Sequence, residues 1–333
     1  MRVGKQSYKL ENTYVIETAT AIGKLEAQGK MKSYVDIIYN DTHFGCDSFE
    51  QAERKMQKET IDKLKSKKLL IDLDIDLIFG GDLINQEIIT THTMKDYDIL
   101  FVGLFGACST FSLAVILSSL FVETKLANNV IAISSSHTEA AERTFRYPIE
   151  YGGAKESSTT LTVTGCGAML ISNKKTNIKV SKLTLGKVVD VGYKNVFDLG
   201  GAMAPSAIET LFAHFEDFKT TPKDYDLILT GDLSQIGRSI VSKTLNEVFT
   251  NVKNYDDCGL YVYDYFEQNV YSGGSGCACC SVVTCGYIYE KLLNKELNKV
   301  LICATGALMN QTTSLQKESI PSISHAFVLE RED

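Results

Sequence analysis

Apolar residues along the chain fall into two similar blocks. Residues 76–83 read Asp-Leu-Ile-Phe-Gly-Gly-Asp-Leu, and residues 226–233 repeat them as Asp-Leu-Ile-Leu-Thr-Gly-Asp-Leu, at an offset of 150 residues. In both copies a short apolar run ends in Gly-Asp, which is typical of a buried strand that leaves the core into a loop. The repeat predicts that the chain is built from two related halves.

A helix is expected before each copy of the repeat. Both predicted helices carry the pattern of a capping box, in which a serine is followed three residues later by Gln or Glu. The patterns are Ser48-x-x-Gln51 in the first half and Ser206-x-x-Glu209 in the second. The sequence therefore predicts helices that begin at Ser48 and Ser206.

A glycine turn, an apolar helix and a strand are expected after each copy. The turn at residues 106–109 corresponds to 276–279, and the strand at 129–133 corresponds to 299–303, both at an offset of 170 residues. The larger offset implies an insertion in the second half. We place it at residues 260–271, where the alternation of aromatic residues predicts a hairpin.

This order of elements predicts an α/β fold of two duplicated halves packed in layers. Residues 1–180 form the first half, which contains the cysteine turn, and residues 181–333 form the second. The helices that begin at Cys108 and near Cys279 are apolar on all sides. We expect them at the centre, where two related sheets pack against them.

Composition excludes several classes of protein. With a net charge of −7 and 23% charged residues, the chain has neither the composition of a disordered protein nor a basic surface for nucleic acid. The most apolar run, residues 113–122, is shorter than the roughly 20 residues that cross a bilayer. The N-terminal residues do not resemble a signal peptide, so we expect a protein that stays inside the cell.

The nine cysteines are expected to be free thiols, because the cytosol keeps thiols reduced. Cys277, Cys279, Cys280 and Cys285 lie close together in the sequence, which is one pattern of a zinc or iron–sulfur site. They do not form a regular pair of C-x-x-C motifs, and small residues surround them. The alternative is a crowded turn of core residues, which needs no metal.

The strongest candidate chemistry lies in the turn at residues 101–110. An apolar strand ends there in Gly-Ala-Cys, and a helix begins at Cys108 and Ser109. The positive end of a helix dipole and its unpaired amides favour a thiolate and bind anions. A cysteine at this place can also be a buried core residue, and the pattern leaves both roles open.

These features together resemble the thiolase superfamily, including ketoacyl synthases that use a cysteine, a histidine and an asparagine. The resemblance implies that the histidine and the asparagine come from two loops of the second half. Here those loops, residues 229–235 and 272–276, contain neither residue type. Because condensation needs donors that stabilise developing negative charge, we expect a protein that is not an enzyme. His137 and His325 are the candidate replacements.

A closer resemblance is to the stage V sporulation protein AD family, a thiolase-like family of endospores. Five segments carry it: residues 103–110, 145–153, 201–205, 230–233 and 304–308. The resemblance implies a spore protein that binds dipicolinic acid, or its calcium chelate, and supports its uptake into the developing spore. Implied partners are membrane proteins of the same sporulation operon at the spore inner membrane, and a second copy of the chain. No cofactor is implied apart from the calcium of the chelate.

The site that this resemblance implies is the groove around Cys108. The helix start would hold one carboxylate of dipicolinate, and Arg143 or Arg146 would hold the other. Asp82 would serve as an oxygen ligand if the chelate carries calcium. The expected ligand-binding residues are Asp82, Cys108, Ser109, His137, Arg146, Asp232 and His325.

Alternatives to these roles stay open. Asp82 and Asp232 are also suited to capping loops, and Arg146 to pairing with Glu142 or Glu150 on the surface. Two other functions fit the sequence. One is a condensing or acyl-transfer enzyme that acts on acyl-CoA through Cys108, and the other is a structural subunit whose groove holds no ligand.

Overall fold

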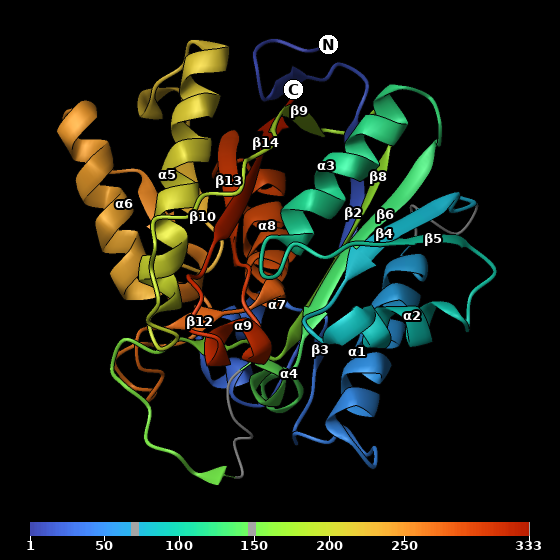
Figure 1. The fold of residues 1–333 in the computed structure, drawn as a ribbon. Coiled ribbons are helices and arrows are strands. Elements are labelled where there is room, and N and C mark those ends of the chain that lie inside the picture. Colours follow the sequence, from blue (N-terminus) through green and yellow to red (C-terminus); the bar gives the residue numbers. More distant parts are fainter. Residues whose placement is uncertain (68–72, 146–150, 333) are drawn as a thin grey trace.

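The computed structural model describes residues 1–67, 73–145 and 151–332. These residues form a twelve-stranded sheet with helices on both sides, and a small second sheet of two strands, β7 (Leu161–Thr162) and β12 (Gly274–Ser275) (Figure 1). The expected α/β architecture is confirmed.

The strands of the large sheet fall into two groups that follow the two halves of the chain. The first half contributes the order β5–β4–β6–β8–β2. The order β9–β14–β13–β10–β11 follows, in which β9 spans the predicted boundary at residue 180 and the other four strands belong to the second half. The two groups meet at a single residue pair, Tyr14 with Lys179, so the expected half-sheets are joined into one. The strand bounds are β1 Ser7–Lys9, β2 Tyr14–Ile22, β3 Ile37–Ile38, β4 Leu77–Gly81, β5 Leu100–Gly103, β6 Asn129–Ser136, β8 Gly165–Ser172, β9 Ile178–Thr184, β10 Leu227–Thr230, β11 Tyr255–Asp257, β13 Lys299–Ala307 and β14 Ser322–Arg331.

Alternation of side chains along the strands separates three apolar cores. In β6, Val130 and Ala132 face a central core between the half-sheets, whereas Ile131 and Ile133 face an outer core under the first-half helices. Strand β13 alternates in the same way between the central core and an outer core of the second half. The fold is therefore layered, with a sheet on each side of central helices.

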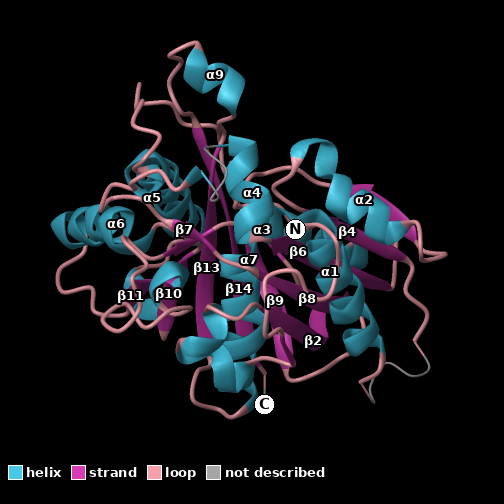
Figure 2. Cartoon of the chain, turned by 90° about the horizontal axis from the view of Figure 1, so that it is seen from below, coloured by secondary structure: helices cyan, strands magenta, loops and turns pink. Residues whose placement is uncertain are grey.

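Helices fill the central layer and cover both outer faces. The central helices are α3 (Thr110–Glu123) and α7 (Cys277–Val283). Helix α7 continues through residues 284–288 into α8 (Tyr289–Leu293). The expected central position of the two apolar helices is confirmed. Helices α1 (Phe49–Lys65) and α2 (Ile88–Met94) lie against the first half, and α5 (Leu199–Phe218) and α6 (Ser234–Val248) against the second (Figure 1). Short helices α4 (Thr138–Phe145) and α9 (Gln311–Leu315) lie at one end, where α9 projects from the molecule (Figure 2). Within the described ranges, no helix has the length and apolarity to cross a bilayer.

The two predicted helix starts have different outcomes. Ser48 caps α1 as expected, because its side chain accepts the N–H of Gln51 at 3.2 Å. The predicted start at Ser206 is wrong. Helix α5 begins earlier, because the side chain of Asp198 accepts the N–H of Gly201 at 2.9 Å. Ser206 therefore lies inside the helix rather than at its start.

The predicted hairpin at residues 260–271 is also wrong, since these residues form turns without a strand. Their aromatic alternation has another cause. Tyr263 is 1% exposed and donates its hydroxyl to the buried carboxyl of Glu26 at 2.7 Å, whereas Phe266 is 92% exposed. The aromatic alternation therefore belongs to an irregular loop in which one tyrosine, Tyr263, lies in the core.

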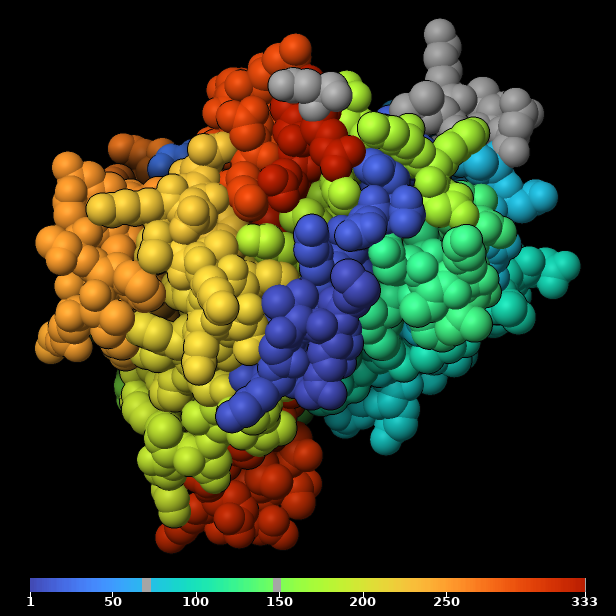
Figure 3. All heavy atoms as spheres, turned by 90° about the horizontal axis from the view of Figure 1, so that it is seen from above, coloured from blue at the N-terminus to red at the C-terminus, as the bar shows by residue number. Residues whose placement is uncertain are grey.

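The N-terminal residues lie against both halves on one face of the molecule, beside α5 (Figure 3). The amides of Lys5 and Gln6 donate to Asp217 of α5 at 3.2 and 3.1 Å, and β1 pairs with β9. The N-terminus is therefore held by the second half, although it leads into β2 of the first.

Candidate functional site

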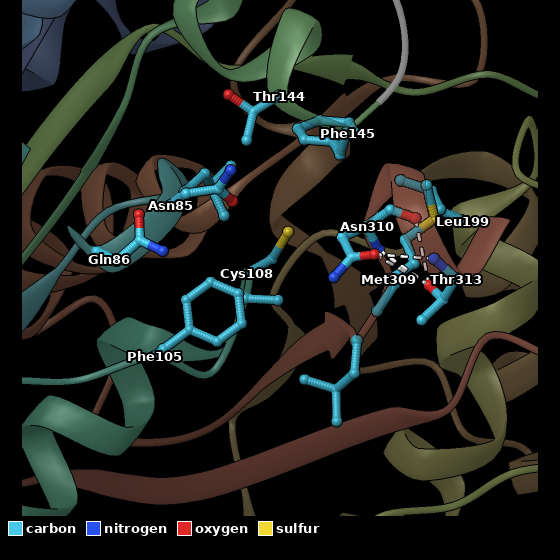
Figure 4. A pocket seen from close by; sticks show the side chains of 14 residues that line it. Asn85, Gln86, Phe105, Cys108, Thr144, Phe145, Leu199, Met309, Asn310 and Thr313 are labelled. Atoms are coloured by element: carbon cyan, nitrogen blue, oxygen red, sulfur yellow. Dashed lines mark hydrogen bonds between the residues drawn. The ribbon is translucent and has the colours of Figure 1, made fainter. Parts of the chain in front are cut away.

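A cavity of about 340 Å³ opens between the two halves, where β4, β5 and β13 end (Figure 4). Its walls come from the loops after these strands, the end of α4 and the first residue of α5. Residues that line it include Asn85, Gln86, Phe105, Cys108, Phe145 and Asn310. The cysteine turn therefore faces a cavity, at the place where the resemblance implies a groove.

The turn that carries Cys108 is closed by its own hydrogen bonds. Ala107 adopts the left-handed conformation, with φ of 49°. The amide of Ser109 donates to the carbonyl of Gly106 at 3.0 Å, and that of Thr110 to Ala107 at 3.2 Å. The Ser109 hydroxyl also donates to Gly106, at 2.7 Å. The amides of Ser109 and Thr110 and the Ser109 hydroxyl are thus used within the turn, and the role of the helix start in holding a ligand carboxylate stays a prediction.

Asp232 reaches the Cys108 thiol from the second half. Its carboxylate is fully buried and accepts hydrogen bonds from Thr305 at 2.5 Å, from Ser275 at 2.8 Å and from the amide of Gly276 at 3.3 Å. The Cys108 thiol lies close enough for this carboxylate to affect its pKa. Asp232 and Ser275 come from the two loops in which the ketoacyl synthase resemblance expects a histidine and an asparagine.

Burial, and then the negative charge of Asp232, raise the pKa of the Cys108 thiol well above its usual range. Of the two roles that the sequence leaves open, this environment favours the buried thiol over the thiolate, because burial disfavours the charged form. Burial also raises the pKa of the Asp232 carboxyl. Burial and the charge of Asp232 both favour the protonated thiol over the thiolate.

Asp82 lies behind the cavity wall instead of in it. Its carboxylate is fully buried and accepts the amide of Ile84 at 2.9 Å, the amide of Thr90 at 2.8 Å and the Thr90 hydroxyl at 2.7 Å. These bonds hold the loop that brings Asn85 and Gln86 to the cavity. A calcium ion at Asp82 would have to replace them, and its role as a ligand stays a prediction.

The two histidines are in other places. His137 is buried beside a second, smaller cavity of about 200 Å³, with Nε2 at 2.8 Å from the carbonyl of Thr42 and Nδ1 at 3.2 Å from Glu139. His325 accepts the amide of Gly186 at 3.2 Å, and burial lowers its pKa to about 4, so it is neutral. Neither histidine lines the cavity at Cys108.

The arginines and the cysteine cluster complete the list of candidates. Arg146 lies outside the described residues, directly after Phe145 of the cavity wall. Arg143 is paired with Glu50 and stacks over Phe49, so it does not reach the cavity. The clustered cysteines are buried in and beside α7, and in the described parts of the chain no three His, Cys, Asp or Glu side chains gather as metal ligands. They are core residues.

Several cavity residues were not predicted. Asn310 and Thr313 form the capping pattern Asn-x-x-Thr before α9, which is visible in the sequence but does not reveal that its loop lies over Cys108. Phe105 lies in a segment that the resemblance singled out, yet no pattern distinguishes it from its neighbours. Position in the folded chain, rather than local sequence, identifies these residues.

Comparisons with known proteins agree with this geometry. The family model of stage V sporulation protein AD matches residues 4–330. Stage V sporulation protein AD of Bacillus subtilis (strain 168) is 43% identical over 330 residues, which cover 98% of this chain and 97% of that protein. Among solved structures, 3-oxoacyl-(acyl carrier protein) synthase III of Aquifex aeolicus has a TM-score of 0.58 at 14% identity, with 96% of this chain and 99% of that chain covered. A variant of OleA from Xanthomonas campestris has a TM-score of 0.59 at 9% identity, with 96% and 97% covered. At such low identity the solved structures show the fold alone, and they confirm that it is thiolase-like.

Proposed function

The chain belongs to the stage V sporulation protein AD family, and we propose that it acts as a non-catalytic binding protein for dipicolinic acid or its calcium chelate. The ligand occupies the cavity at Cys108. Binding there supports the uptake of the ligand into the developing spore, with membrane proteins of the same operon as partners. The observation that carries the proposal is the cavity at Cys108, whose thiol has its pKa raised by burial and by the Asp232 carboxylate.

A carboxylate next to the thiol favours binding over acyl transfer. A nucleophilic cysteine needs a lowered pKa or an adjacent base that takes its proton. Asp232 does the opposite, because its negative charge adds to burial in keeping the thiol protonated. Ser275 and Thr305 donate their hydroxyls to Asp232, and neither residue lines the cavity at Cys108.

The cavity suits a small planar ligand. Its volume of about 340 Å³ is at the lower end of the range of about 300–1,000 Å³ for small-molecule sites. Phe105 and Phe145 lie on different sides of the Cys108 sulfur and offer ring faces (Figure 4). Dipicolinate is a pyridine ring with two carboxylates, so its ring would contact the phenylalanines and its carboxylates would need polar partners.

A second copy of the chain is the proposed partner of the sheet edge at β5. This strand is the last of the large sheet, and its Leu100 and Val102 side chains are 72% and 43% exposed. An exposed apolar edge strand is a template for another strand. Two copies of β5 paired antiparallel would satisfy both edges in a symmetric dimer.

Titration calorimetry tests the proposed binding function. Dipicolinate, with and without calcium, is titrated into the wild type and into Cys108→Ala, with Cys46→Ala as a matched control because Cys46 lies away from the cavity. We expect binding to the wild type and to the control, and weaker binding to Cys108→Ala. In parallel, the mass of the protein is measured after incubation with acyl-CoA, and we expect no acyl group on Cys108. Acylation with turnover would instead show an enzyme, and neither binding nor acylation would show a structural subunit.

A further inference from the structure

We propose that the side-chain amides of Asn310 and Gln86 donate hydrogen bonds to the two carboxylates of a planar aromatic dicarboxylate in the cavity. This inference rests on the proposed binding function and names the groups that determine its specificity. The two residues come from different halves of the chain, and both line the cavity. Figure 4 shows them on opposite sides of Cys108.

The amide of Asn310 is oriented by helix α9. Its Oδ1 accepts the N–H of Thr313 at 2.9 Å and the Thr313 hydroxyl at 3.4 Å. Because the oxygen is used in the cap, the Nδ2 group is left as a donor, and Figure 4 shows it on the side of Cys108 and Phe105. The cap thus fixes which end of the amide faces the ligand.

Gln86 is held at the opposite wall by an unusual backbone. It has φ of 60° and ψ of 19°, and Glu87 follows with φ of 52°. Two successive left-handed residues other than glycine are disfavoured, and they persist where surrounding contacts impose them. Here the contacts are the bonds from Ile84 and Thr90 to Asp82. This conformation presents the Gln86 side chain to the cavity.

Two donors on opposite walls match a ligand with an acceptor at each end. A carboxylate accepts hydrogen bonds from amide N–H groups, and a rigid aromatic ring keeps two carboxylates at a fixed separation. Phe105 and Phe145 supply ring faces between the two walls. The thiol of Cys108 is neutral and adds no charge that would repel the ligand.

Variants of Asn310 separate its donor role from its capping role. Asp and Ser cap helices about as well as Asn, so Asn310→Asp and Asn310→Ser keep α9 while they remove the side-chain amide donor. A hydrogen bond to a charged group corresponds to a factor of about 10 to 100 in affinity. We expect Asn310→Ser to bind dipicolinate about 10-fold more weakly and Asn310→Asp at least about 100-fold more weakly, with unchanged thermal unfolding. Gln86→Glu should behave like Asn310→Asp.

Two related ligands test the two-ended recognition. Calorimetry is repeated with isophthalate, which lacks the ring nitrogen, and with pyridine-2-carboxylate, which has one carboxylate. We expect Asn310→Asp to lower the affinity for pyridine-2-carboxylate less than it lowers the affinity for dipicolinate. The reason is that the single carboxylate of pyridine-2-carboxylate can bind to Gln86 instead of residue 310.

Each result has a distinct meaning. Binding of dipicolinate by Asn310→Asp within two-fold of the wild type would overturn the inference and leave the binding function intact. Binding of isophthalate but not dipicolinate by the wild type, with loss in Asn310→Asp, would overturn the proposed ligand and support the amide recognition. If the wild type binds none of the three probes, both proposals fail.

Discussion

Replacing Asp82 by alanine should abolish binding although Asp82 does not line the cavity. The substitution leaves the buried amide and hydroxyl of Thr90 without their acceptor, and each such group costs about 1–3 kcal/mol. We therefore expect a loss of about 2–6 kcal/mol in the free energy of unfolding. The left-handed backbone conformation of Gln86 and of Glu87 costs about 1–2 kcal/mol at each residue. Without the bonds to Asp82, both residues should relax to a favoured conformation, which displaces this wall of the cavity.

Urea unfolding measures the loss of stability, and calorimetry with dipicolinate measures the loss of binding. A domain of ordinary stability, about 5–15 kcal/mol, stays folded after such a change. Thr90→Val is the matched variant, because it removes only the Thr90 hydroxyl. That hydroxyl donates a hydrogen bond to Asp82 and accepts one from the side-chain amide of Gln57. It should weaken stability and binding in the same direction by a smaller amount. The two changes combined should cost less than the sum of each alone, because both act on one contact.

Two outcomes would refute the positioning role of Asp82. If Asp82→Ala loses binding while its free energy of unfolding and that of Thr90→Val match the wild type, Asp82 contacts the ligand directly. If Asp82→Ala is destabilised as expected but binds dipicolinate normally, the loop after β4 is not part of the binding site.

Three further predictions concern pH, reactivity and assembly. Partial burial raises the pKa of Glu87 to about 7, so its carboxyl is neutral below that pH and charged above it. The affinity for dipicolinate should therefore fall between about pH 6 and about pH 8 in the wild type and stay level in Glu87→Gln. An equal fall in both proteins would contradict this prediction. Cys108 should react slowly with iodoacetamide because its pKa is raised by burial and by Asp232, and Asp232→Asn should speed the reaction; an unchanged rate would show that Asp232 does not control the thiol. Sedimentation velocity should show a dimer for the wild type and a monomer for Val102→Glu, whereas a wild-type monomer at micromolar concentration would exclude pairing through β5.

Much of the fold was predictable because its repeats are carried by apolar periodicity. Strand β4 and its copy β10, the two central helices and the strands after them all follow from short runs that must be buried. The helix start at Ser206 failed because an earlier cap at Asp198 competes with it, and a local pattern cannot rank two caps. The hairpin failed because Tyr263 enters the core to reach Glu26, a contact between residues far apart in the sequence.

The site was less predictable, since it is assembled from loops whose meeting depends on the whole fold. Cys108 was found because its turn has a local signature. The local sequence did not identify Asp232 as the partner of Cys108, because the loop with Asp232 reaches the thiol from the second half of the chain. It also did not reveal that burial has a larger effect on the pKa of the thiol than the helix dipole. Asp82 has the same Gly-Asp pattern as Asp232, yet only Asp232 contacts the thiol, because the two halves differ in what their loops pack against.

The crystal structure of the chain with saturating dipicolinate tests the central claim most directly. The account predicts density for an intact ligand in the cavity, with its ring beside Phe105 and Phe145, one carboxylate at Nδ2 of Asn310, and an unmodified sulfur on Cys108. Density for the ligand at another surface, or for a covalent group on Cys108, would contradict it.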